Sequence, residues 1–225
     1  MMIHRRNVLT GMVATAVVAG TGRARAATGA RGFDIRRGDT LIGGQSIAVR
    51  QDGDETVAES KIDIAVKFFG ITAYRYTLES RERWRGGRLI ALDSTCDDDG
   101  TSDFVRAVAV DGGLKVDGSR HQGILPADIV PSSYWSSSFL TRPTWISIQS
   151  GAPMAVTCAK AGETTMQTAQ GPRPVSRWNV SGELELTLFY SGDEWAGNAF
   201  DAKGEVGLIS AKTLGPALGP LAPHG

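Results

Sequence analysis

The sequence predicts an all-β protein, folded as a strongly curled antiparallel meander, half-barrel or barrel-like, with at most one short helix. Apolar and polar residues alternate with period two in almost every segment, and almost none shows a period of 3.6. Turn signals rich in Gly and Asp separate these segments. A meander of about ten strands leaves exposed edges unless it curls or closes.

The chain is expected to open with a hairpin. Residues 33–36 and 40–42 flank the turn signal Arg37-Gly38-Asp39. Gly43-Gly44 predicts a bulge or bend, and Asp52-Gly53-Asp54 predicts the next turn.

Apolar and polar residues alternate most regularly in the next two predicted strands. Residues 61–68 place their apolar members on one face, namely Ile62, Ile64, Val66 and Phe68. Residues 74–84 separate into a charged face and a second face, and the second face consists of Tyr74, Tyr76, Leu78, Ser80, Glu82 and Trp84.

The rest of the chain repeats this pattern with two interruptions. Further strands are expected at 88–92, 104–110, 114–116, 182–190, 195–200 and 206–211. The acidic segment Asp97–Gly100 predicts a solvated hairpin turn, because a calcium loop needs a distal glutamate where this chain has Val108. Residues 119–143 are irregular, with room for a short helix at 128–138, and the polar, proline-containing residues 161–177 predict a surface loop.

The N-terminus predicts an export signal. Arg5-Arg6 precedes an apolar run from Met12 to Ala19, and Ala24-Arg25-Ala26 resembles a cleavage site. The arginine pair resembles the twin-arginine type of signal. The apolar run would span only about 12 Å of a hydrocarbon core of about 30 Å. We therefore expect cleavage near Ala26 and a periplasmic or secreted protein with no stable membrane span.

The mature chain predicts one β domain over residues 31–212, followed by a disordered Pro/Gly tail at 213–225. No second block of composition and no repeat of fixed period is present. The leader contains four of the 24 basic residues and none of the 24 acidic ones, so the mature net charge is −4. This charge argues against a nucleic-acid partner.

The two cysteines, Cys96 and Cys158, are expected to form a disulfide, because two lone cysteines in an oxidising compartment are more often bridged than catalytic. Such a bridge would stabilise the fold by about 4 kcal/mol. Two separate buried thiols are the alternative, since the twin-arginine route transports proteins that have already folded.

Motifs for catalysis and metal binding are absent from the sequence. The mature chain has only His121 and His224, and it lacks G-x-S-x-G, H-E-x-x-H, C-x-x-C and a Walker loop. We therefore expect no metal and no cofactor. An enzymatic reading would need proton transfer by Glu82, His121 or Tyr76.

Aromatic residues near strand ends and one carboxylate are the candidate ligand-binding residues. In a barrel mouth they would line an apolar cavity, and they would serve equally well as core. Glu82 either points inward with a raised pKa or pairs with a cross-strand arginine. The candidates are Tyr74, Tyr76, Glu82, Trp84, Tyr134, Trp135 and Trp145.

The run Tyr74-x-Tyr76…Glu82-x-Trp84-x-x-Gly87-Arg88-Leu89 resembles an uncharacterised family of exported bacterial proteins. The opening at 33–43 and the ending at 182–200 resemble that family too, and the likeness extends over about residues 31–212. The family looks distantly like the lipoprotein-carrier half-barrels, whose curled antiparallel sheets hold acyl chains. The resemblance implies architecture only. Those carriers also use helices as a lid, whereas this sequence predicts little helix.

Together these features favour a periplasmic binding or carrier protein for a lipid or other apolar small molecule. The alternatives are a structural or assembly partner of an exported complex, which would present a sheet edge to a periplasmic protein, and a barrel-type isomerase or cyclase.

Overall fold

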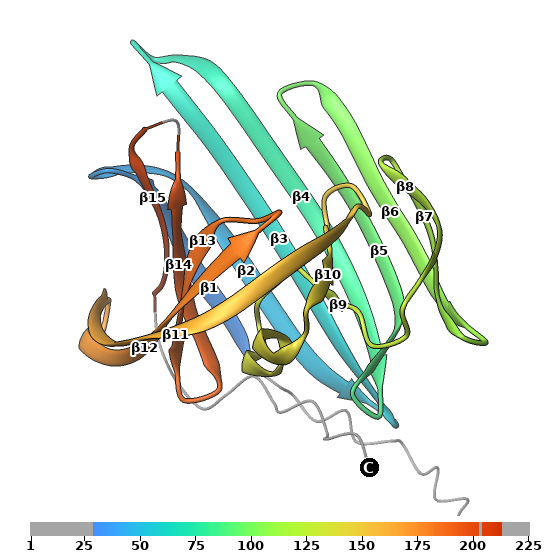
Figure 1. Cartoon of the computed structure of the whole chain (residues 1–225). Coiled ribbons are helices and arrows are strands. Elements are labelled where there is room, and N and C mark those ends of the chain that lie inside the picture. Colours follow the sequence, from blue (N-terminus) through green and yellow to red (C-terminus); the bar gives the residue numbers. More distant parts are fainter. Residues whose placement is uncertain (1–28, 203, 213–225) are drawn as a thin grey trace, which may run out of the picture.

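The computed structural model describes residues 29–202 and 204–212, which form a single sheet of fifteen strands (Figure 1). The predicted leader and the predicted tail lie outside the described residues. The strands are β1 (Ala30–Arg37), β2 (Thr40–Asp52), β3 (Glu55–Phe68), β4 (Ile71–Arg85), β5 (Arg88–Asp98), β6 (Thr101–Val110), β7 (Gly113–Gly118), β8 (His121–Leu125), β9 (Val130–Pro131), β10 (Thr144–Ile146), β11 (Pro153–Thr168), β12 (Gly171–Gly182), β13 (Leu186–Ser191), β14 (Glu194–Asp201) and β15 (Val206–Ala211). One 3₁₀ helix, η1 (Ser137–Thr141), lies between β9 and β10.

The sheet is a curled meander, and the first and last strands of the chain both lie near its middle. Its order is β8-β7-β6-β5-β4-β3-β2-β1-β15-β14-β13-β12-β11-β10-β9, so the first and last strands are neighbours. All pairs are antiparallel except β9 with β10. The long strands β2–β6 form one wall, and β11–β15 cross in front of it (Figure 1). The ends β8 and β9 do not pair, so the sheet curls without closing. The predicted fold class is confirmed.

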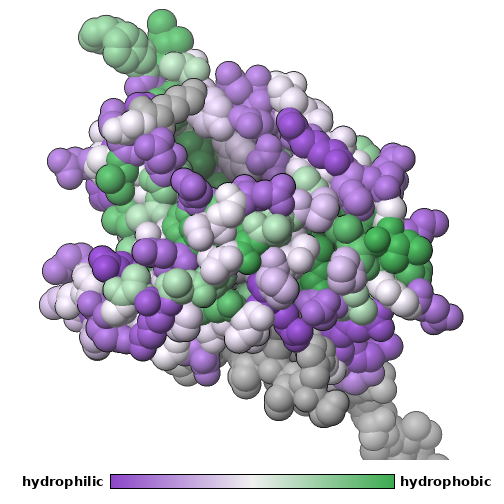
Figure 2. All heavy atoms as spheres, in the orientation of Figure 1, coloured by the Kyte–Doolittle hydropathy of each residue, from purple (hydrophilic) through white to green (hydrophobic). Residues whose placement is uncertain are grey.

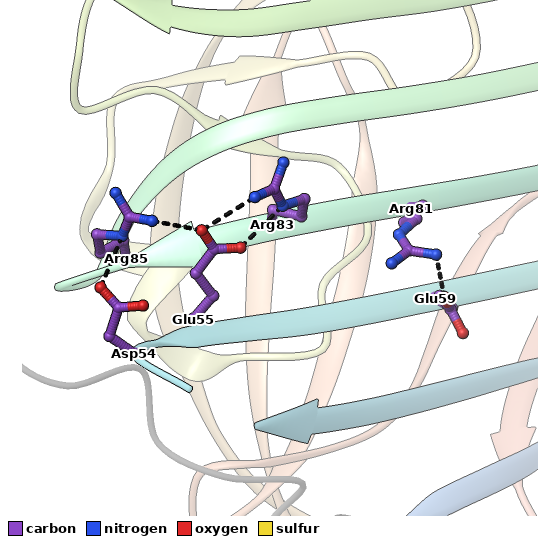
Figure 3. A network of polar contacts seen from close by, with 6 residues as sticks. All are labelled: Asp54, Glu55, Glu59, Arg81, Arg83 and Arg85. Atoms are coloured by element: carbon purple, nitrogen blue, oxygen red, sulfur yellow. Dashed lines mark hydrogen bonds and ion pairs between the residues drawn. The ribbon is translucent and has the colours of Figure 1, made fainter. Parts of the chain in front are cut away.

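The two faces of the long strands differ as the alternation predicts. On β4, Leu78, Ser80, Glu82 and Trp84 are buried on the concave face, whereas the odd-numbered arginines lie on the outer face. Cross-strand ion pairs cover that outer face (Figure 3). Glu55 accepts hydrogen bonds from Arg83 and Arg85, and the Arg83 hydrogen bond holds the pKa of Glu55 below its usual value.

The opening hairpin has the expected bulge. The pairing of β1 with β2 skips Ile42, directly before Gly43. Gly43 also lies against β3 so closely that an added Cβ would sit 2.2 Å from the backbone oxygen of Asp63. Because no side chain fits in that space, glycine is required where the bulged strand meets its neighbour.

The predicted surface loop at 161–177 is wrong, because these residues belong to the long β11–β12 hairpin. The hairpin is polar because most of its side chains are exposed on both faces, so no alternation marks it. Pro172 and Pro174 lie beyond the end of β13, which pairs with β12 only from Ser176 onward. That part of β12 has a free edge, where a missing N–H is tolerated.

The short helix expected at 128–138 is also misplaced. Residues 130–131 form β9, and the helical turn is η1, which begins at Ser137. The Ser136 hydroxyl accepts a hydrogen bond from the Ser138 N–H at 3.4 Å and caps the turn. The turn places Phe139 in the core, where it is 1% exposed.

Candidate functional site

Side chains on the concave face of β4 are more buried near the end of the strand than near its beginning. Tyr74 and Tyr76, at the beginning of the strand, are half-buried, whereas Trp84, near its end, is only 1% exposed. The concave face therefore has a filled end around Trp84 and an open end around Tyr74. Figure 2 shows the molecule hollowed toward the open end, between the β14–β15 hairpin and the long strands.

Glu82 lies at the filled end and binds two indoles. It is fully buried, and its Oε2 accepts hydrogen bonds from Trp84 Nε1 and Trp135 Nε1, both at 2.9 Å. The arginines of β4 lie on the opposite face, so the alternative of a cross-strand ion pair is not realised. Glu82 therefore joins β4 to the segment before η1.

Burial raises the pKa of Glu82 above its ordinary value, as expected for an inward-pointing carboxyl. The Ser133 hydroxyl and the two indole N–H groups oppose this effect. Ser133 Oγ and Glu82 Oε1 nevertheless have no hydrogen bond of standard geometry within the described part of the chain. The carboxyl therefore keeps its proton to a higher pH than an exposed glutamate does.

The aromatic candidates at this end pack against one another. The Trp84 ring stacks on Phe139 at 5.3 Å and meets the edge of Trp135 at 6.1 Å. Tyr134 and Trp145 have centroids 5.7 Å apart. Trp145 Nε1 donates to the backbone oxygens of Phe139 and Arg142. These side chains fill the core rather than line an open cavity.

Three serines cross the middle of the concave face. Ser60, Ser80 and Ser94 are direct cross-strand partners on β3, β4 and β5. Each is more than nine-tenths buried, and in residues 29–202 and 204–212 none of the three hydroxyls finds a hydrogen-bond partner. A polar stripe thus separates the filled aromatic end from the open end.

The open end has an apolar wall with polar tips, which we call the mouth. Its wall consists of Tyr74 and Tyr76 with their cross-strand partners Val66 and Ile64, all half-buried. The Tyr74 hydroxyl donates to Asp98 at 2.7 Å, and the Tyr76 hydroxyl donates to Gln149 at 3.4 Å. Burial raises the pKa of both phenols, so they remain neutral donors.

The mouth includes residues that are not among the seven candidates from the sequence. The alternation identified the apolar face of β3, but it gave no reason to count Ile64 and Val66 among the candidate ligand-binding residues. Gln149 was missed, since it lies in an irregular turn that no periodic signal marks. The separation of the seven candidates into a filled end and a mouth depends on which segments cover the concave face.

Residues suggested for proton transfer are far apart. Tyr76 and Glu82 are six residues apart on one strand, a distance of about 20 Å. His121 lies on β8, four positions away from β4 in the sheet, which is about 19 Å. The fold therefore does not assemble these three side chains into one site.

The remaining site predictions are local. Cys96 and Cys158 are both free, so the expected disulfide is not shown, and burial raises the pKa of both thiols. The acidic segment forms the β5–β6 turn, in which Gly100 N–H donates to Asp97 Oδ1 at 2.8 Å. In the described ranges no cluster of three or more His, Cys, Asp or Glu side chains is arranged to bind a metal ion. The same ranges contain no helix with the length and apolar character needed to cross a membrane.

Comparison with known proteins assigns the family. A family model described as "Domain of unknown function (DUF6134)" matches residues 33–209, and the chain therefore belongs to that family. The expected membership of an uncharacterised family is confirmed. No curated protein and no solved structure matches the chain.

Proposed function

We propose that this member of the family is a periplasmic binding or carrier protein, and that its mouth takes up a lipid or another apolar small molecule. The observation that supports the proposal is the half-buried apolar wall of Ile64, Val66, Tyr74 and Tyr76 at the open end of the concave face. Apolar walls with a few polar groups are typical of small-molecule sites. The export signal that the sequence predicts supports the proposed compartment.

The mouth has the chemistry to orient an amphipathic ligand. An acyl chain would lie against the apolar wall, and its polar end would meet the Tyr76 hydroxyl and Gln149, whose amide donates to Asp103 at 3.3 Å. Burying about 300 Å² of acyl chain gains about 7 kcal/mol before association costs. Such a gain supports micromolar binding or weaker, which suits a carrier that must release its ligand.

A titration with a fatty acid bearing an environment-sensitive fluorophore tests this proposal. The unmodified chain should show saturable binding, and Ile64→Asp should weaken it at least tenfold, because a charge in the half-buried wall loses its hydration when the ligand covers it. Val108→Asp, on the outer face of β6, is the matched control and should bind normally. Absence of saturable binding, or equal affinity of the two variants, would overturn the proposal.

A further inference from the structure

The β3–β4 hairpin ends in an exposed apolar tip. Phe68, Phe69 and Ile71 are 68%, 92% and 74% exposed, and the two phenyl rings lie 4.5 Å apart. The hairpin projects beyond the neighbouring strand ends (Figure 1), and apolar atoms stand out from the molecule at the same place (Figure 2). Exposed apolar side chains gathered at one point mark an interaction site.

We propose that this tip docks the protein on a phospholipid bilayer by inserting Phe68, Phe69 and Ile71 among the acyl chains. The inference goes beyond ligand binding, because it depends on the hairpin tip and not on the mouth.

The length of the apolar tip fits the depth of an interfacial anchor. Lys67 and Thr72 are the first polar residues on the two strands, and both are exposed. Lys67 is three residue steps before Gly70 and Thr72 is two steps after it, which correspond to about 10 Å and about 7 Å of extended chain. Interfacial anchors reach about 5–10 Å into the boundary between headgroups and acyl chains. Lys67 would then lie at the level of the phosphates.

The exposed area favours a bilayer over a protein partner. The two phenylalanines together expose roughly 300–400 Å². A stable protein interface needs about 800 Å² on each partner, and Ile71 does not make up that difference. A narrow convex tip would also need a matching pocket in a protein, whereas acyl chains adapt to its shape.

The charges near the tip indicate that apolar insertion, rather than attraction to anionic lipids, drives the docking. Arg75 pairs with Asp63 at 3.3 Å, and Lys61 pairs with Glu79. Lys67 lies between these pairs and the tip, and the nearby β5–β6 turn is acidic. A neutral bilayer therefore suffices.

Two further apolar residues lie at the same end of the sheet. Leu41, after the β1–β2 turn, is 55% exposed, and Val206, after the β14–β15 turn, is 66% exposed. The two turns are joined by a hydrogen bond from Gly38 N–H to the Val206 oxygen at 3.0 Å. Docking through the hairpin tip would turn the mouth toward the bilayer surface.

Flotation with neutral phosphatidylcholine vesicles tests the inference. The unmodified chain should float with the vesicles. The combined variant Phe68→Ser, Phe69→Asn and Ile71→Ser should reduce the bound fraction at least tenfold, with asparagine chosen because residue 69 has a φ of +50°. The matched control is Val108→Ser with Ile124→Ser, two exposed apolar residues on β6 and β8. All three proteins share the same N-terminal segment, so binding by that segment contributes equally.

Equal flotation of the tip variant and the control, or a tenfold loss of binding in about 0.5 M salt, would overturn the inference. The tip variant should still bind the fluorescent fatty acid in solution without vesicles. Loss of flotation alone therefore reports on the tip, and loss of fatty-acid binding alone reports on the mouth.

Discussion

Trp84→Ala should lower the free energy of unfolding by about 3–5 kcal/mol, which is the cost of truncating a buried tryptophan in a packed core. Trp84 is 1% exposed and contacts Phe139 and Trp135. Its Nε1 also donates to Glu82, so the variant removes one of the two donors to a buried carboxyl. Equilibrium unfolding in guanidinium chloride measures the effect.

Trp178→Ala on β12 is the matched control. Trp178 is only half-buried, and its Nε1 donates to Ser176 at 3.2 Å beside a surface hollow of about 510 Å³. We expect Trp178→Ala to lower the free energy of unfolding by less than half as much as Trp84→Ala does. A loss below about 1 kcal/mol for Trp84→Ala would show that the ring borders open space rather than a filled core.

Glu82→Ala should destabilise the protein by about 2–5 kcal/mol, because two buried indole N–H groups lose their acceptor and a cavity opens. Glu82→Gln should cost much less, since the amide oxygen can still accept from Trp84 and Trp135. Chemical unfolding of the two variants beside the unmodified chain measures the difference. Equal losses would contradict the hydrogen-bonding role of Glu82.

Glu82→Gln and the unmodified chain together also test the protonation of Glu82. Burial raises the pKa of this carboxyl in the folded state, so the native state binds the proton more tightly than the unfolded chain does. The proton on Glu82 makes its full contribution to stability below the pKa of the unfolded state, about 4.3. This contribution is lost as pH rises through the pKa of Glu82 in the folded state. Glu82→Gln should therefore gain stability relative to the unmodified chain as pH rises. If the difference in the free energy of unfolding between Glu82→Gln and the unmodified chain stayed constant from about pH 4 to about pH 8, the raised pKa would be contradicted.

Alternation predicted the orientation of side chains better than their surroundings. The period-two pattern of β4 correctly placed Ser80, Glu82 and Trp84 on the concave face. It could not distinguish a cavity wall from a packed core, because both require inward side chains. The difference arises from Phe139 and Trp135, which reach β4 from a segment more than fifty residues away in the chain.

The sequence did not predict the mouth, for a related reason. Ile64 and Val66 have the same local pattern as core residues of β3, and only the path of the strands that cross the front determines that they are half-buried. The β11–β12 hairpin was missed because a strand exposed on both faces has no apolar periodicity to detect.

Lipid analysis of the purified protein tests the central claim most directly. Protein prepared without detergent should release an acyl-chain lipid on extraction with organic solvent, in a substoichiometric but measurable amount by mass spectrometry, because micromolar binding loses part of its ligand during purification. The Ile64→Asp preparation should contain much less, and the Val108→Asp preparation should match the unmodified chain. Extracts of all three proteins that contain equal traces of lipid, together with native mass spectra showing only the unliganded chain, would contradict a lipid-binding mouth.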